Sequence, residues 1–190
     1  MKTVWVVLIA IGVIIIILAG WVIGGLNQVA ILNEAITASW SQVENQLQRR
    51  NDLIPNLVNT VKGYASHEKG LFTEVTRLRG QWASASTQDD KIKAAEGMQS
   101  AISRLLLIAE NYPDLKANQN FLSLQAQLEG TENRISVERN RYNRNVQIFN
   151  SYIRTIAGGI FARMRGLDKP AEYFEAESAA KAVPKVDFQL

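Results

Sequence analysis

The sequence contains no cysteine and only one histidine, His67, in 190 residues. Without thiols the chain can form neither disulfide bonds nor thiolate metal sites, and a single imidazole does not make the nitrogen-rich site that transition metals prefer. A Gly-rich phosphate loop, a nucleophile elbow and a zinc-protease helix motif are also missing. We therefore expect a protein that is not an enzyme and that takes no cofactor, no metal and no small-molecule substrate.

A basic patch is missing as well. Lysine and arginine number 21 against 18 aspartate and glutamate residues, which gives a net charge of +3, and both signs are spread along the chain. Proteins that bind nucleic acid cluster their basic residues on one face, often beside aromatic residues or within a known module. The charge pattern therefore argues against a nucleic-acid partner.

The longest apolar run is at the N-terminus. Residues Val4 to Ile23 carry no charge, and 14 of these 20 residues are Val, Leu or Ile. At about 1.5 Å per residue they span roughly 30 Å, the thickness of the bilayer hydrocarbon, with Trp5 and Trp21 at the two ends. A cleavable signal peptide is the alternative, but its apolar region is normally only ~7–15 residues long. The run predicts an uncleaved transmembrane anchor at residues 1–25, with the lipid bilayer as partner.

Charges beside the anchor predict its orientation. Lys2 precedes the apolar run, whereas the 20 residues after Ile23 carry only Glu34. Glu44 follows, and the first basic residue on that side is Arg49. Because lysine and arginine are retained on the cytoplasmic side, we expect a cytoplasmic N-terminus and an extracytoplasmic domain.

The remaining sequence follows the period of a helix. Apolar residues recur about every 3.6 positions from Leu26 into the sixties, and again over residues 68–85 and 90–111. Thr87–Asp90 is typical of a capping box that opens the third of these helices. Pro55 lies inside the first pattern and predicts a kink there.

A fourth helix is predicted from a seven-residue repeat of apolar residues, which indicates coiled-coil-like packing. The repeat comprises Phe121, Leu128, Ile135, Tyr142, Phe149 and Ile156. A companion row, with the same seven-residue spacing on the neighbouring face of the helix, is interrupted by polar residues. Gly158-Gly159 is expected to end the helix. The predicted fold class is all-α: a transmembrane helix followed by an antiparallel four-helix bundle of two long and two short helices. The bundle covers residues 26–162, and residues 163–190 form a tail that is extended at 183–188.

Several segments, in this order, resemble the LemA family across about residues 26–188. They are Ala38–Gln42, Gln46–Val58, Val61–Glu68, Ala109–Asn118, Thr131–Ile135 and Arg141–Asn143. The resemblance implies a bacterial protein of the plasma (inner) membrane with an N-terminal anchor and an antiparallel helical bundle. It implies no established biochemical activity. Members are discussed beside membrane metalloproteases and in the biogenesis of membrane organelles. Residues 156–166 depart from the family, in which a proline and a Gly-Phe pair are expected near this turn.

One predicted site is a layer of charged residues inside the bundle. Counted at about 1.5 Å per residue from Gly25, Arg49 stands roughly 36 Å along the first helix, and Glu132 reaches the same height on the fourth. The predicted layer comprises Arg49, Arg50, Asp52, Glu132 and Arg134. We expect Arg49 or Arg50 to contact Glu132, and Asp52 to lie near Arg134. Such a layer either fixes the register of the helices or forms a pocket for a charged partner.

The second predicted site is a self-association interface. The two long helices extend beyond the two short ones, so a two-helix stalk near the membrane would leave Trp40 and some of the other large apolar groups partly exposed. Gly20 and Gly24 form a small-xxx-small pattern that lets membrane helices approach closely. The predicted interface comprises Gly20, Gly24, Leu32, Ile36, Trp40, Val43, Tyr142, Val146, Phe149 and Ile153. Alternatively, the tail, with Tyr173, Phe174 and Phe188, folds back over its own stalk.

Two functions remain open. The first is a non-catalytic, membrane-anchored scaffold that self-associates into a homo-oligomer and presents its domain to other envelope proteins. The second is a monomeric adaptor or sensor that regulates a membrane protease or another membrane partner.

Overall fold

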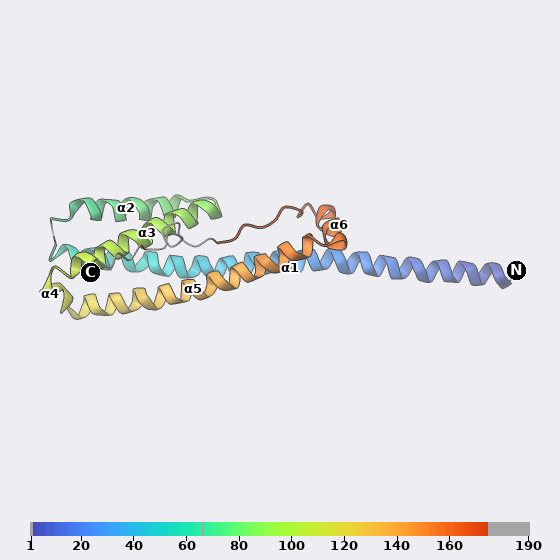
Figure 1. Ribbon diagram of the computed structural model, residues 1–190, viewed down its shortest axis with the longest axis horizontal. Coiled ribbons are helices and arrows are strands. Elements are labelled where there is room, and N and C mark those ends of the chain that lie inside the picture. The colour runs from blue at the N-terminus through green and yellow to red at the C-terminus, as the bar shows by residue number, and fades with distance from the viewer. Residues whose placement is uncertain (1, 66, 175–190) are drawn as a thin grey trace, which may run out of the picture. The chain divides into compact units, whose positions relative to one another are not determined.

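The computed structural model describes residues 2–65 and 67–174 of the chain, and 85% of them are helical with no strand among them (Figure 1). The predicted all-α class is confirmed. The helices are α1 (Lys2–Lys62), α2 (Lys69–Ser84), α3 (Gln88–Ala109), α4 (Pro113–Lys116), α5 (Gln119–Ile153) and α6 (Ile156–Met164). The segment 183–188, expected to be extended, lies outside the described residues.

Helix α1 is 61 residues long and continues without a break past Gly24, Gly25 and Pro55. Every valine, isoleucine and leucine from Val4 to Leu18 is at least 48% exposed. Within the described residues, α1 is the one helix long and apolar enough to cross a membrane. The apolar N-terminal part of α1 therefore indicates a single-pass anchor.

The described residues form two compact units, and α1 and α5 each contribute to both. Unit 1 comprises Met1–Gln42 and Glu138–Tyr173, of which residue 1 is not described. Unit 2 comprises Val43–Val137, with Phe174 also assigned to it. Each unit has a hydrophobic core of its own.

Unit 2 is built around the end of α1, helices α2, α3 and α4, and the beginning of α5. Leu57, Val61, Leu105 and Leu115 are fully buried in its core. The cap predicted at the start of α3 is present, because the side chain of Thr87 accepts a hydrogen bond from the Asp90 backbone N–H. Caps of this kind satisfy backbone donors that the first helical turn leaves without partners.

Unit 1 is built from the first part of α1, the end of α5, helix α6 and the segment after it. Its core contains Val29, Phe149, Phe161 and Ala162. The apolar residues of α1 and α5 thus pack against a third helix that the sequence analysis did not predict.

The expected end of the fourth helix at Gly158-Gly159 is wrong. Helix α5 ends at Ile153, and both glycines lie inside α6, where Thr155 accepts a hydrogen bond from the Gly158 N–H. A Cβ on Gly158 would lie 2.1 Å from the carbonyl oxygen of Tyr152. The missing side chain lets the first turn of α6 pack closely against the end of α5, so the chain changes direction there.

Candidate functional site

Arg50, on α1, is the best-connected member of the predicted polar layer in unit 2. Its side chain is only 6% exposed. One terminal nitrogen donates to Gln99 Oε1 at 2.9 Å and to Glu132 Oε2 at 3.2 Å, and the other donates to the Ala95 carbonyl at 2.7 Å. The guanidinium group therefore links α1 to α3 and α5 at once.

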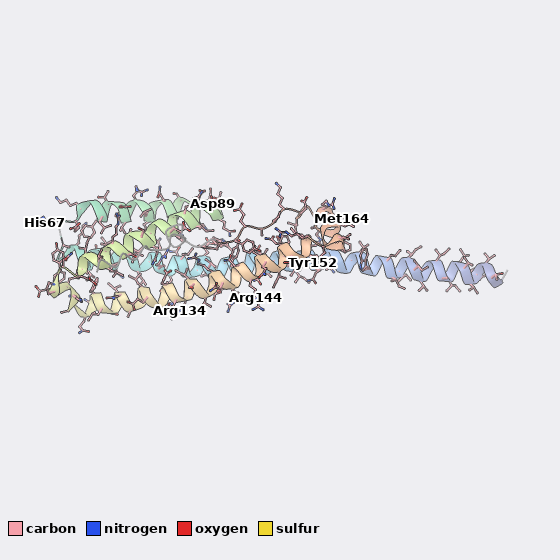
Figure 2. All side chains as sticks on the ribbon, viewed as in Figure 1. His67, Asp89, Arg134, Arg144, Tyr152 and Met164 are labelled. Atoms are coloured by element: carbon pink, nitrogen blue, oxygen red, sulfur yellow. The ribbon has the colours of Figure 1, made fainter. Side chains whose placement is uncertain are left out.

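The other predicted members of the layer are not brought together. Arg49, Asp52 and Arg134 are exposed, and Figure 2 marks Arg134 on α5. The Asp52 carboxylate accepts a 2.7 Å hydrogen bond from Gln48, on its own helix. Neighbouring residues on a helix point about 100° apart, so Arg49 faces water where Arg50 faces the interior. The distance along each helix correctly predicted that Arg50 and Glu132 lie close together. It did not predict which side of α1 faces Glu132.

The geometry of the Arg50 layer favours the register interpretation over a pocket. A charged group that is nine-tenths buried is expensive unless hydrogen bonds and an opposite charge satisfy it, and Arg50 has both. The donors identified above are directed at protein acceptors. The layer joins three elements, because Arg50 on α1 donates to two residues of α3 and one of α5.

An open groove in unit 2 has a different character. It has a volume of about 940 Å³ and is lined by the end of α1 and one face of α2. Its lining residues are Val58, Lys62, Gly63, Lys69, Phe72, Thr73, Thr76 and Arg77. They carry three positive charges and no negative one, around an aromatic and an aliphatic side chain. The Lys62 Nζ lies 5.8 Å from the centroid of the Phe72 ring.

Such a lining suits an acidic segment that also carries an apolar side chain. Sequence reasoning missed this groove because Lys62, Lys69 and Arg77 are spread over two helices and look like ordinary surface charges. Their shared signal is their position, because all three lie within three helical turns of the α1–α2 turn. Figure 2 marks the exposed His67 in that turn.

The predicted self-association residues fall into three groups. Gly20 and Gly24 are exposed; Leu32, Ile36, Trp40 and Ile153 are half-buried; Val43, Tyr142, Val146 and Phe149 are buried. Burial within the chain itself makes the last four unavailable to a second chain. The expectation that these large apolar groups stay exposed therefore does not hold for them.

The segment after α6 explains part of this burial, because it packs along α5 within unit 1. The Tyr142 hydroxyl donates to the Glu172 carbonyl at 2.9 Å. Asn150 pairs with the backbone of Ala171, donating to its carbonyl at 2.9 Å and accepting from its N–H at 2.8 Å. The alternative expectation, that the tail covers its own stalk, agrees with the structure as far as Tyr173; Phe188 lies outside the described residues.

Polar positions in the apolar repeat mark these contacts in the sequence. Asn145, which interrupts the companion row of α5, donates to the Ala35 carbonyl of α1 at 3.1 Å. Asn150 directly follows Phe149 of the main row, and its side chain is almost fully buried. A buried asparagine needs hydrogen-bond partners, so its place beside the seam was the signal that another segment packs there.

Within residues 2–65 and 67–174, no three His, Asp or Glu residues come together as metal ligands would.

The described residues form an all-helical fold with one apolar helix at the N-terminus, which indicates a helical membrane protein with a single anchor.

The family follows from comparison with known proteins. The sequence profile of the LemA family matches residues 39–188, and the chain belongs to this family. Magnetosome proteins MamQ 1 and MamQ 2 of Paramagnetospirillum magneticum are each 25% identical to it over 190 residues, covering 86% of this chain and 69% of theirs. Magnetosome protein MamQ of Magnetospirillum gryphiswaldense is 25% identical over 179 residues, covering 80% of this chain and 65% of its own.

Proposed function

We propose that this protein is a non-catalytic, membrane-anchored helical scaffold that self-associates and presents unit 2 to other envelope proteins. It spans the bacterial plasma membrane once, with its N-terminus in the cytoplasm and its domain outside. In this proposal unit 2 acts as an antiparallel bundle in which α1, α2, α3 and α5 are the four packing helices. The link to magnetosomes belongs to the named relatives, which are 25% identical to this chain, and it forms no part of the proposal.

The observation that carries the proposal is the continuity of α1. One helix contains both the exposed apolar run Val4–Ile23 and the buried residues Ile54, Leu57 and Val61 of the unit 2 core. The anchor is thus joined to its domain by a helix and not by a flexible linker. That is the arrangement a scaffold needs.

Self-association is supported by open space on α1. A Cβ built on Gly20 or on Gly24 would meet no atom within 4 Å, whereas one on Gly25 would overlap the Phe161 ring. The two glycines therefore lie on a strip of α1 that α6 leaves uncovered. Small residues four apart allow two membrane helices to approach closely.

Replacing Gly20 and Gly24 together by leucine tests this interface. We expect the wild-type chain to form a defined multimer in mild detergent and in chemically crosslinked membranes, and the double variant to lose it. Gly12→Leu is the matched control, because Gly12 has equally open space but lies outside the pair. A wild-type chain that is monomeric in both settings would contradict self-association and leave the anchor unaffected.

The second candidate function is a monomeric adaptor or sensor that regulates a membrane protease or another membrane partner. The groove lined by Lys62, Lys69 and Arg77 favours it, since a basic groove around Phe72 suits an acidic segment of another protein.

Charge reversal at the groove tests this adaptor role. Lys69→Glu with Arg77→Glu should abolish crosslinking of a partner protein in native membranes, because like charges repel an acidic segment. Arg79→Glu is the matched control, since Arg79 is exposed on the same helix but does not line the groove. Equal loss of the partner in both variants would rule out the groove as its site.

A further inference from the structure

Helix α6 is apolar on two faces, and unit 1 uses only one of them. Gly158, Phe161 and Ala162 are buried against the core of unit 1. On the opposite side lie Ile156, Ile160 and Met164, spaced four residues apart, with exposed fractions of 90%, 45% and 62%. Of the nine residues of α6, only Arg163 is charged. A helix that is apolar all round usually lies in a protein interior or a membrane.

The position of α6 along α1 points to the membrane. Its Phe161 ring packs edge-on against Trp21, with 4.9 Å between the ring centroids, and it fills the space beside Gly25. Val22 and Leu26 contact the same cluster. These α1 residues lie at the end of the apolar run Val4–Ile23, where the helix leaves the hydrocarbon. Helix α6 therefore lies beside the end of the apolar run of α1.

Aromatic residues beside the end of the apolar run agree with a membrane surface. The Tyr152 hydroxyl lies 3.5 Å from the Gly25 carbonyl, so a tyrosine and Trp21 stand at one height, as in the aromatic belt of membrane proteins. Figure 2 marks Tyr152 at the end of α5 and Met164 on α6, both beside α1.

Basic residues flank α6 on both sides. Arg154 precedes it, and Arg163 and Arg165 lie at its end, all three exposed. Between residues 154 and 169 the chain carries four basic residues and one acidic residue. Short apolar helices with basic flanks bind at bilayer interfaces that contain anionic lipids.

We propose that α6 is a second membrane contact, in which Ile156, Ile160 and Met164 insert into the headgroup region of the bilayer that α1 crosses. This inference rests on the anchor proposed above. It adds a function for α6, which would fix the tilt of α1 and the depth at which α1 lies in the bilayer. The contact does not depend on which side of the membrane the domain occupies.

The experiment uses the full chain, which lacks cysteine, so one introduced thiol is the only labelling site. Single variants Ile160→Cys, Ile148→Cys and Ile14→Cys are labelled with an environment-sensitive fluorophore and reconstituted into vesicles of phosphatidylcholine and phosphatidylglycerol. Ile148 is the matched control, because it is an isoleucine of unit 1 with the same 45% exposure as Ile160. The lipids carry nitroxide quenchers either near the headgroup or near the end of the acyl chain.

We expect the probe at 160 to shift its emission to the blue and to be quenched by the headgroup nitroxide, and the probe at 148 to be quenched by neither. The probe at 14 should be quenched by the acyl-chain nitroxide. If 160 behaves like 148 while 14 is quenched, α6 does not touch lipid and the anchor stands. If 14 is not quenched either, the anchor itself is wrong. Disulfide-linked dimers of the unlabelled Ile160→Cys variant, together with no lipid quenching of the labelled one, would assign the face to a second copy and overturn the proposal.

Discussion

Unit 2 and unit 1 were predicted from the same kind of pattern, with different success. In unit 2 the apolar residues of sequential segments pack on one another, so periodicity alone predicted the helix faces that bring Ile54, Leu105 and Leu128 into a common core. In unit 1 the pattern of α1 and α5 was equally clear, but part of the cover comes from α6 and the segment after it. An apolar stripe shows that a helix needs cover without showing which part of the chain supplies it.

The largest effect that would sharpen this comparison concerns Phe149, an almost fully buried aromatic residue of unit 1. Phe149→Ala should lower the free energy of unfolding by about 3–5 kcal/mol, the usual cost of the cavity that such a change leaves. Hydrogen exchange in detergent should show lost protection in unit 1, while unit 2 amides keep theirs. The exposed Ile148→Ala is the control and should change little. Equal loss of protection in both units would show that they unfold as one.

How much of each unit could be predicted depends on which physical signal reports it. Helix periods and the Thr87 cap are local, so they gave the helices of unit 2 and the start of α3. The ion pair between Arg50 and Glu132 could be predicted by counting the rise per residue along the first and fourth helices. The other two acceptors of Arg50 were not, because Ala95 and Gln99 lie on α3, whose placement no local pattern fixes.

The errors in unit 1 have a common physical source. Gly158-Gly159 was taken as a helix stop because glycine disfavours helix interiors. Here Gly158 allows contact between the first turn of α6 and the carbonyl of Tyr152, a tertiary requirement that propensity does not contain. The sequence analysis counted only two helices in the stalk, whereas Phe149 packs with Phe161 and Ala162 of α6, and Tyr142 contacts the segment after it. Trp40, which was expected to stay partly exposed, is half-buried.

The next effect tests the polar layer of unit 2. Arg50→Ala should lower the free energy of unfolding by about 2–4 kcal/mol, since it removes hydrogen bonds from a buried charged group to three acceptors. Glu132→Ala should cost under about 1 kcal/mol, because the Glu132 side chain is 38% exposed and water screens the pair. Arg49→Ala, the exposed neighbour, is the control and should stay within about 0.5 kcal/mol of wild type. Denaturant unfolding of the full chain in detergent measures all three, and equal costs at 49 and 50 would refute the assigned face.

The smallest effect concerns the segment that completes unit 1. Asn150→Ala removes both hydrogen bonds to the backbone of Ala171 and leaves that N–H and carbonyl without these partners. We expect a loss of about 1–2 kcal/mol, the cost typical of buried polar groups deprived of a partner. Hydrogen exchange at Ala171 should quicken while the amides of α2 and α3 stay protected. The adjacent exposed Ser151→Ala should leave exchange at Ala171 unchanged, since it alters α5 without touching this contact. If Asn150→Ala also leaves exchange at Ala171 unchanged, packing alone holds the segment, and the asparagine beside the seam was not the signal for it.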